Sequence, residues 1–392
     1  MQPEVRFRSF FMGGFECSSH RRRDGRRLDL IASTGHDRLA REDYRRLHEF
    51  GLRTVRDGLR WHRIETEPGR YDWSSFLPML RAARETQVQV IWDLCHYGWP
   101  DDIDIWSDSF IERFARFAGE AARVVREESD DIPFYCPVNE LSFWAWAGGE
   151  VGRMNPCAEK QGHQLKRQLV RAAIAGIEAV RSVDPRARFV YAEPSIHVTS
   201  GASTARARTN AEIYRQAQFE AYDLISGRIE PELGGRPDYL DIVGANFYPD
   251  NQWYLAGPTI HFGHHAYRPF RTMLAELHAR YERPILVTET GAEGGVRASW
   301  FHYVCGEVLA ALAQDVPVLG VCFYPILDYP GWDDDRHCDV GLLTNPDAQG
   351  RRSVCRSLLD EFERQQMVFD TVRGATAPDM NSAILSMVGS ND

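Results

Sequence analysis

Short apolar runs alternate with amphipathic stretches along most of this 392-residue chain. The apolar runs are near-continuous, which is typical of parallel strands buried on both faces. In the stretches between them, apolar residues recur at helical spacing. We predict strands at residues 7–14, 54–59, 88–94, 134–138, 188–192, 242–246, 285–288 and 318–324. We predict helices at residues 37–49, 74–85, 109–127, 163–182, 211–225, 270–281, 299–313 and 353–365.

Eight strand-then-helix units without a break in composition predict one α/β domain, a closed (β/α)8 TIM barrel with extended βα loops. We place this catalytic barrel at residues 1–366. The weakly patterned segment 367–392 is expected to be a C-terminal tail, peripheral or partly disordered. An open doubly wound sheet is the alternative, but the turn at residues 13–16 lacks the GxGxxG pattern of that fold.

Composition narrows the class of partner and the compartment. Hydrophobic residues make up 43% of the chain, and the net charge of −10 argues against nucleic acid or an anionic membrane as the main partner. The eight cysteines form no CxxC pair, the N-terminus has no signal-peptide pattern, and no apolar run approaches about 18 residues. We expect a cytoplasmic protein with free thiols, although cysteine spacing alone leaves disulfides open.

Two glutamates stand where apolar runs end. Asn139-Glu140 follows the run at 132–138, and Glu289 follows the run at 284–288, about 150 residues further along. The carboxyl ends of barrel strands meet at one face, so side chains from opposite halves of the chain converge there. Cleavage of a glycosidic bond needs a proton donor and a nucleophile on opposite sides of the anomeric carbon. The pair therefore predicts the catalytic site of a glycoside hydrolase.

The neighbours of these glutamates resemble retaining glycoside hydrolases of the (β/α)8 clan, most closely family 1, the β-glucosidase family. Asn139-Glu140 matches the family's NEP except that a leucine replaces the proline, and Glu289 lies in a segment similar to PIYITENGA. Arg56 lies in a segment similar to YRFSISWSRI, and His96 matches the histidine of HWDLP.

The resemblance continues toward the C-terminus and covers about residues 7–345. Tyr248 ends a segment similar to DFLGINYY, and Asp328 and Trp332 match the aspartate and tryptophan of SLLDNFEW. The family implies that the chain is a retaining β-glycosidase that uses neither a metal nor another cofactor.

The resemblance also implies a role for each matching residue. Glu140 would be the general acid and then the general base, and Glu289 the nucleophile, held ionised by Arg56 and Tyr248. Asn139 would donate a hydrogen bond to the sugar 2-hydroxyl.

Two further positions would hold the sugar. His96 would bind the neighbouring hydroxyl, and Trp332 would offer an apolar face to the ring. We expect the two catalytic carboxyl groups to lie about 5–5.5 Å apart, whereas inversion needs more than about 6.5 Å.

The sequence departs from the family where the sugar is recognised. Gly331 stands where the family has a glutamate that grips the sugar, His20 aligns with a glutamine, and Tyr324 replaces a tryptophan. Loss of a charged acceptor removes hydrogen bonds of roughly 1.5–3 kcal/mol each. We expect Glu16, His20, Asp328 or the run 333–335 to supply acceptors instead, or Gly331 to leave room for a larger sugar.

Three clusters of charged or titratable residues were considered as sites for an anion or a metal ion. The arginines within residues 21–27 would suit an anionic sugar substituent, but clustered charges are usually a solvated loop. The histidines at 261, 264 and 265 lack the spacing of a metal site, and the run 333–335 lacks the spaced oxygens of a calcium loop.

Three functions remain in view, all with a small carbohydrate or glycoside as ligand. The leading one is hydrolysis by double displacement. The second is transfer of the sugar to another acceptor, and the third is a non-catalytic carbohydrate-binding barrel, which would need no such carboxylate pair. The sequence leaves open the identity of the sugar and whether the chain forms a homo-oligomer.

Overall fold

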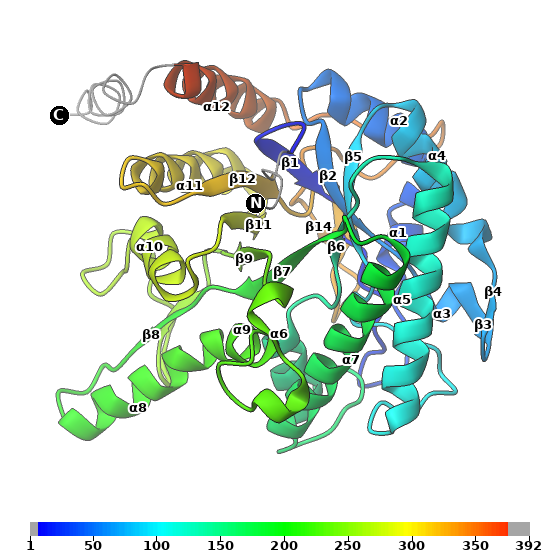
Figure 1. Ribbon diagram of the computed structural model, residues 1–392. Helices are drawn as coiled ribbons and strands as arrows, with labels where there is room; N and C mark the ends of the chain where they lie inside the picture. The colour runs from blue at the N-terminus through cyan, green and yellow to red at the C-terminus, as the bar shows by residue number, and fades with distance from the viewer. Residues whose placement is uncertain (1–6, 375–392) are drawn as a thin grey trace.

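The computed structural model describes residues 7–374, in which eight parallel strands close into a barrel (Figure 1). Each strand pairs with the strands before and after it in the barrel. The first strand pairs with both the second and the last, which closes the barrel. The predicted barrel is confirmed, and the open sheet is excluded because it would leave two free edges. The strands are β1 (Phe11–Gly14), β2 (Thr54–Gly58), β5 (Gln89–Asp93), β6 (Phe134–Cys136), β7 (Arg188–Pro194), β9 (Ile242–Asn246), β11 (Ile285–Thr290) and β12 (Val318–Phe323).

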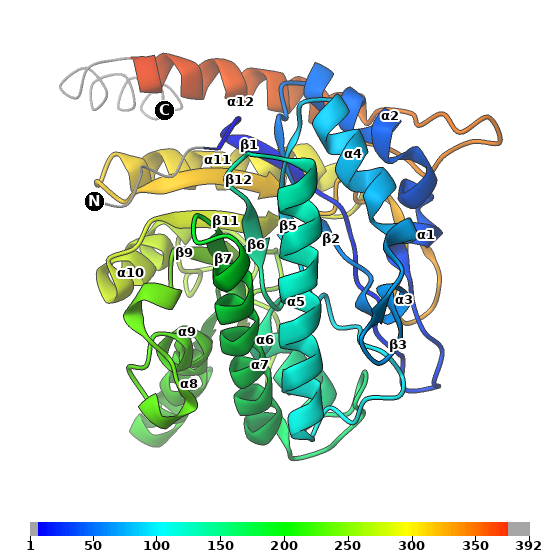
Figure 2. The same cartoon turned by 45° about the vertical axis from the view of Figure 1, so that its right-hand side comes forward.

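Helices surround the barrel, and Figures 1 and 2 show the long helices α5 and α7 side by side on its outer surface. The larger helices are α2 (His36–Glu49), α4 (Leu77–Glu85), α5 (Asp108–Glu128), α7 (Gly162–Val183), α8 (Ala205–Gln216), α9 (Glu220–Ile225), α10 (Phe270–Tyr281), α11 (Arg297–Leu312) and α12 (Arg356–Gly374). Short elements lie in the loops: α1 (Leu30–Ser33), α3 (Trp61–Ile64), α6 (Leu141–Trp144) and the strand pairs β3 (Glu65–Glu67) with β4 (Arg70–Tyr71), β8 (His197–Thr199) with β10 (Gln252–Tyr254), and β13 (Tyr329–Pro330) with β14 (His337–Cys338).

One expected helix, at 211–225, is divided into α8 and α9. The side chain of Gln218, between them, donates to the carbonyl of Arg215 at 2.8 Å and accepts from the backbone of Ile196 at 3.0 Å. These bonds fix the bend between the two helices. Periodicity did not predict this bend, because α8 buries only Ala211 and Arg215 and leaves Ile213 exposed, so its apolar residues do not mark a face that packs on the barrel.

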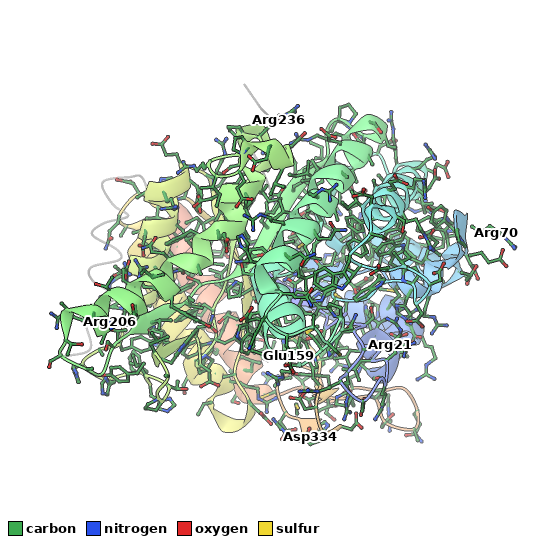
Figure 3. All side chains as sticks on the ribbon, turned by 90° about the horizontal axis from the view of Figure 1, so that it is seen from below. Arg21, Arg70, Glu159, Arg206, Arg236 and Asp334 are labelled. Carbon is green, nitrogen blue, oxygen red and sulfur yellow. The ribbon has the colours of Figure 1, made fainter. Side chains whose placement is uncertain are left out.

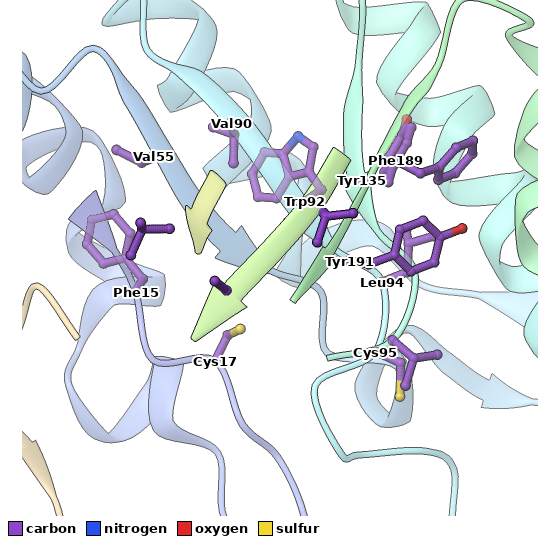
Figure 4. Close-up of a cluster of buried hydrophobic side chains, with 14 of the residues drawn as sticks. Phe15, Cys17, Val55, Val90, Trp92, Leu94, Cys95, Tyr135, Phe189 and Tyr191 are labelled. Atoms are coloured by element: carbon purple, nitrogen blue, oxygen red, sulfur yellow. The ribbon is translucent and has the colours of Figure 1, made fainter. Parts of the chain in front are cut away.

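Two apolar layers form the core. Alternate strand residues point to opposite faces, so Ile91 lies inside the barrel while Val90 and Trp92 pack outward against helices (Figure 4). The inner layer consists of Met12, Ile91, Phe134, Val190, Ile242, Leu286 and Cys322. Beyond it, toward the carboxyl ends of the strands, buried residues become polar, beginning with Arg56 and Asp93. The core therefore fills one end of the barrel and leaves the other for chemistry.

The two ends of the chain meet at the filled end of the barrel. The first strand begins at Phe11, later than expected, because the Ser9 hydroxyl takes the backbone N–H groups of β2 that a longer strand would pair. The last helix continues past residue 366 to Gly374, and its Phe369 ring packs against β1. The rest of the expected tail, 375–392, lies outside the described residues.

All eight cysteines are unpaired, so the expected free thiols are confirmed. Within residues 7–374 there is no helix with the length and apolar character needed to cross a bilayer.

Candidate active site

A cavity of about 1130 Å³ opens where the barrel strands end, and both predicted catalytic glutamates line it. Seven of the ten predicted site residues contribute to its wall: His96, Asn139, Glu140, Tyr248, Glu289, Tyr324 and Trp332. The volume lies slightly above the usual range of small-molecule sites, about 300–1,000 Å³.

Glu289 lies one residue before the end of β11 and faces two hydrogen-bond donors. Its Oε1 accepts from the Arg56 guanidinium at 2.6 Å, and its Oε2 accepts from the Tyr248 hydroxyl at 2.9 Å. Arg56 is itself fixed by a bidentate bond to Asp93, at 2.9 and 2.7 Å. Both contacts of Glu289 stabilise negative charge on its carboxylate.

Glu140 follows β6 in a left-handed backbone conformation, with φ of 42°, which residues other than glycine seldom adopt. The turn is held by a bond from the Glu140 backbone N–H to the carbonyl of Ala192 at 2.9 Å. Its carboxyl group meets the Tyr97 hydroxyl at 2.6 Å and the Asn246 amide at 2.8 Å. The strained turn therefore places this carboxyl group among neutral partners only.

The two glutamates consequently differ in their electrostatic environment. Burial and the charge of Glu289 raise the pKa of Glu140 above its ordinary value, and the bonds from Tyr97 and Asn246 offset this only in part. Glu289, by contrast, has a guanidinium as its partner. The site thus holds one carboxyl group that favours its proton beside another whose negative charge is stabilised, as acid and nucleophile require.

A chain of hydrogen bonds orients His96 and Asn139. The Nδ1 of His96 lies 2.8 Å from Asp93, and the Nε2 lies 2.9 Å from the amide nitrogen of Asn139. The Asn139 oxygen accepts from Arg56 at 2.5 Å, so its amide group must point its donors toward His96 and the Tyr97 hydroxyl, 2.8 Å away. This arrangement assigns the proton on His96 to Nδ1 and leaves Nε2 as an acceptor.

Three predicted site residues lie behind the cavity wall. Arg56 is buried beneath Glu289, and His20 packs against the Trp332 ring with centroids 4.7 Å apart. Burial lowers the pKa of His20 to about 3, so the imidazole is neutral. Asp328 accepts from the backbone of Gly341 at 2.8 Å and fixes that loop.

Sequence reasoning missed Tyr97, Asn246 and Asp93 as partners of the catalytic groups. Asn246 and Asp93 are each the last residue of a strand, although the strand predicted for Asp93 ended one residue later. In a barrel, a polar residue at the carboxyl end of a strand is by itself a sign of a functional position. Tyr97 directly follows His96, but nothing in the sequence shows that its hydroxyl turns toward Glu140. Glu193, also at a strand end, is buried and accepts from the backbone of Ser142 at 3.1 Å, and its side chain does not reach the described cavity wall.

The charged loops around the cavity neutralise one another. Figure 3 shows Arg21, Glu159 and Asp334, from three separate loops, on the same face of the molecule. Each of the five arginines within residues 21–27 pairs with a carboxylate, at Asp24, Asp101, Glu159 or Asp335. The run 333–335 likewise meets arginines. Neither cluster is therefore free to hold a ligand of opposite charge.

Two groups in the described part of the chain bring metal-ligating atoms together. One consists of Cys17, Asp93 and His96, and the other of Asp328, His337 and Asp339. In the first, Arg56 occupies both oxygens of Asp93, and burial raises the pKa of the Cys17 thiol well above its usual range, which opposes thiolate ligation. In the second, Asp328 is bonded to the loop backbone.

The fold is similar to that of solved β-glucosidases. No protein-family model matches the sequence, and neither does any protein in the curated set. A family 1 β-glucosidase from Thermotoga maritima superposes with a TM-score of 0.74 at 13% identity, over 93% of this chain and 98% of that one. The same protein's complex with glucoimidazole gives 0.74 at 13% identity, over 92% and 98%.

A third structure, the AHE enzyme from Alicyclobacillus herbarius, gives 0.73 at 16% identity, over 93% of this chain and 98% of that one. The expected similarity in fold to family 1 is confirmed. At sequence identities this low, the superpositions show similarity of fold and nothing about activity.

Proposed function

We propose that this chain is a retaining β-glycosidase in which Glu140 is the acid and base and Glu289 is the nucleophile. The observation that carries the proposal is the pair of glutamates lining one cavity in opposite environments. Glu140 has a raised pKa, and Glu289 is bonded to Arg56 and Tyr248.

In the first step, Glu289 attacks the anomeric carbon while Glu140 gives its proton to the oxygen of the departing group. A covalent glycosyl ester forms on Glu289, and the leaving group departs as an alcohol. The ester carries no charge, so the electrostatic cause that raised the pKa of Glu140 is removed. Glu140 then takes a proton from water, which attacks the anomeric carbon and releases Glu289.

The neighbouring residues support this sequence of steps. Asn139 lines the cavity next to Glu140, and its amide group, which here donates to His96 and Tyr97, is the group we assign to the sugar 2-hydroxyl. Trp332 lines the same cavity and offers an apolar face. The double displacement requires a separation of about 5–5.5 Å between the two carboxyl groups, which stays a prediction.

Activity on a panel of aryl β-glycosides tests the proposal directly. Glu289→Gln should lower kcat by about 10⁴-fold or more, because removal of a nucleophile removes the covalent route. A 2-deoxy-2-fluoro glycoside should label the wild-type enzyme, and peptide mass spectrometry should find the sugar on Glu289.

Glu293→Gln is the matched control, since Glu293 lines the same cavity but is paired with Arg336. It should keep kcat within a few-fold of wild type. A label on another residue, or full activity in Glu289→Gln, contradicts the assignment. The same assay with an added alcohol separates hydrolysis from sugar transfer, and binding without turnover would identify a non-catalytic barrel.

A further inference from the structure

Glu16 is a third buried glutamate in the cavity wall, and the catalytic steps make no use of it. It lies two residues beyond the end of β1, is 6% exposed, and its Oε1 is 3.8 Å from the His96 Nε2. Within residues 7–374 its carboxylate accepts one hydrogen bond, from the backbone of Ser18 at 2.9 Å. Burying a carboxylate this deeply with so few donors is unfavourable unless a ligand supplies the rest.

Glu16 also lacks a permanent cation. Within residues 7–374 no arginine or lysine pairs with it, and the Arg56 guanidinium is already bonded to Asp93, Glu289 and Asn139. Burial accordingly raises the pKa of Glu16. A donor group on a bound sugar would relieve this unpaired acceptor.

A second unsatisfied polar group lies close by. Tyr324 lines the cavity, is 2% exposed, and its hydroxyl has no hydrogen-bond partner among the described residues. His96 lies beside both groups, with its Nε2 3.8 Å from Glu16 and its ring parallel to that of Tyr324 at 6.2 Å between centroids, so Glu16 and Tyr324 share one corner of the cavity. Gly331 contributes no side chain to the same wall. Among the described residues, this corner thus holds a carboxylate with a single hydrogen bond, from the Ser18 backbone, and a hydroxyl with none.

The charge of the whole cavity favours one class of sugar. Nine carboxylate side chains line it, against three from lysine or arginine. Each of the three cations is paired with a lining carboxylate: Arg153 with Asp333, Lys166 with Glu220, and Arg336 with Glu293. Of the other lining carboxyl groups, Glu140 favours its proton, and Glu289 and Asp334 face arginines. Glu16, Glu150 and Asp250 have no arginine or lysine partner in the described part of the chain, so an anionic sugar would meet their negative charge.

We propose that Glu16 is the specificity-determining acceptor of this site, bonding a sugar hydroxyl or ammonium group and excluding uronides and sugar phosphates. The proposal rests on the proposed glycosidase function and deepens it. Under this proposal Glu16, which follows β1, binds the sugar in place of the glutamate that the resembled family has at the position of Gly331, in the loop after β12.

The experiment compares wild type with Glu16→Gln, which keeps an oxygen for the Ser18 backbone but loses the charge. The substrates are the neutral aryl β-glycoside that wild type cleaves best, its monodeoxy and amino analogues, and the matching uronide and 6-phosphate. For the neutral glycoside, Glu16→Gln should lower kcat/KM by about 10- to 100-fold. The preference for neutral over anionic substrates should fall by about tenfold.

The monodeoxy series separates recognition from a merely structural role. One deoxy analogue should already be poor for wild type and lose little more in Glu16→Gln, because the variant and the analogue remove the same bond. Asp250→Asn is the control, since Asp250 is an exposed carboxylate of the same cavity with no hydrogen-bonded side-chain partner among the described residues. It should keep the wild-type kcat/KM on the neutral glycoside and on each of its deoxy analogues. Glu16→Asp, which keeps the charge, should be intermediate and serves if Glu16→Gln fails to fold.

Three results would overturn the inference. They are unchanged kinetics in Glu16→Gln, an equal loss on every deoxy analogue, or efficient cleavage of uronides or phosphates by wild type. Absence of any turnover by wild type would instead reject the glycosidase function itself.

Discussion

At the scale of single residues, the protonation of Glu140 depends on Tyr97. The Tyr97 hydroxyl donates to Glu140 at 2.6 Å and accepts from the Asn139 amide at 2.8 Å. The Tyr97 hydroxyl therefore adjusts the acidity of the proposed proton donor and orients the amide that we assign to the sugar 2-hydroxyl. The effect on acidity should be visible in the pH dependence of kcat/KM, and the effect on the amide in the value of kcat/KM at the optimum.

Tyr97→Phe removes a bond that lowers the pKa of Glu140, so this pKa should rise further. Activity requires protonated Glu140 and is lost as pH rises through its pKa, so the alkaline limb of kcat/KM should move to higher pH. We also expect kcat/KM at its optimum to fall by about 10- to 100-fold, because Asn139 loses a partner. The measurement is the pH profile of kcat/KM on an aryl glycoside.

Tyr191→Phe is the control for this experiment. Tyr191 is also buried, but it lies in the outer layer of the core and its hydroxyl has no partner among the described residues. Its pH profile should match that of wild type. An alkaline limb that stays in place or moves to lower pH in Tyr97→Phe contradicts the assigned role of the phenol.

The two glutamates that we propose as catalytic could be found from the sequence, because each follows an apolar run and lies beside a motif. Tyr97 and Asn246 could not be assigned in this way. Their contacts with Glu140 depend on how three neighbouring strand ends are staggered around the barrel, and a one-residue change of register would turn each side chain away. Glu16 was visible as a spare acceptor, but its burial without a cation is a property of the folded chain.

At the scale of elements, a buried ionic network ties α2 to the barrel. His36, the first residue of α2, contacts Asp43 and Asp57 at 2.8 Å each. Asp57 points outward from β2, and Arg352, just before α12, bonds Asp43 at 2.6 Å. This network joins three parts of the chain that sequence periodicity treats as independent.

Its protonation makes stability depend on pH. Burial lowers the pKa of His36, but Asp57 and Asp43 more than offset this and raise it to about 9, from an ordinary value of 6.5. Folding therefore binds a proton, and the stabilisation is complete below pH 6.5 and lost as pH rises through 9. Between pH 7 and 10 the free energy of unfolding should fall by on the order of 2–3 kcal/mol more in wild type than in His36→Gln.

Urea denaturation at several pH values measures this difference. His48→Gln is the control, because His48 lies on the same helix and its side chain forms no hydrogen bond among the described residues. That variant should follow the pH dependence of wild type. Parallel curves for wild type and His36→Gln would show that His36 is not charged in the fold.

At the scale of the whole molecule, β1 closes the barrel by pairing with β12, and α12, the last described helix, packs against β1. Barrel closure was predictable, since eight buried runs alternating with helices leave few other ways to cover every strand. The end of the last helix was not. The pattern weakens after residue 366, yet Phe369 and Val372 are buried, because the surface that covers them comes from the opposite end of the sequence.

Phe369 packs α12 against the start of β1 and provides the test. It is 1% exposed, and its ring centroid lies 4.7 Å from that of Phe10 and 5.0 Å from that of Phe11. Phe369→Ala should lower the free energy of unfolding by about 3–5 kcal/mol, since it leaves a cavity in a packed aromatic cluster. Its kcat/KM well below the unfolding temperature should be unchanged, because Phe11 begins β1 at the end of the barrel opposite Glu289.

Met367→Ala is the matched control on the same turn of α12. Met367 is 65% exposed, so its truncation should change the free energy of unfolding by no more than about 0.5 kcal/mol. Urea denaturation of both variants gives the comparison. Equal, small losses would mean that the barrel is complete without the last turns of α12, and that the domain ends near residue 366 as its sequence pattern indicates.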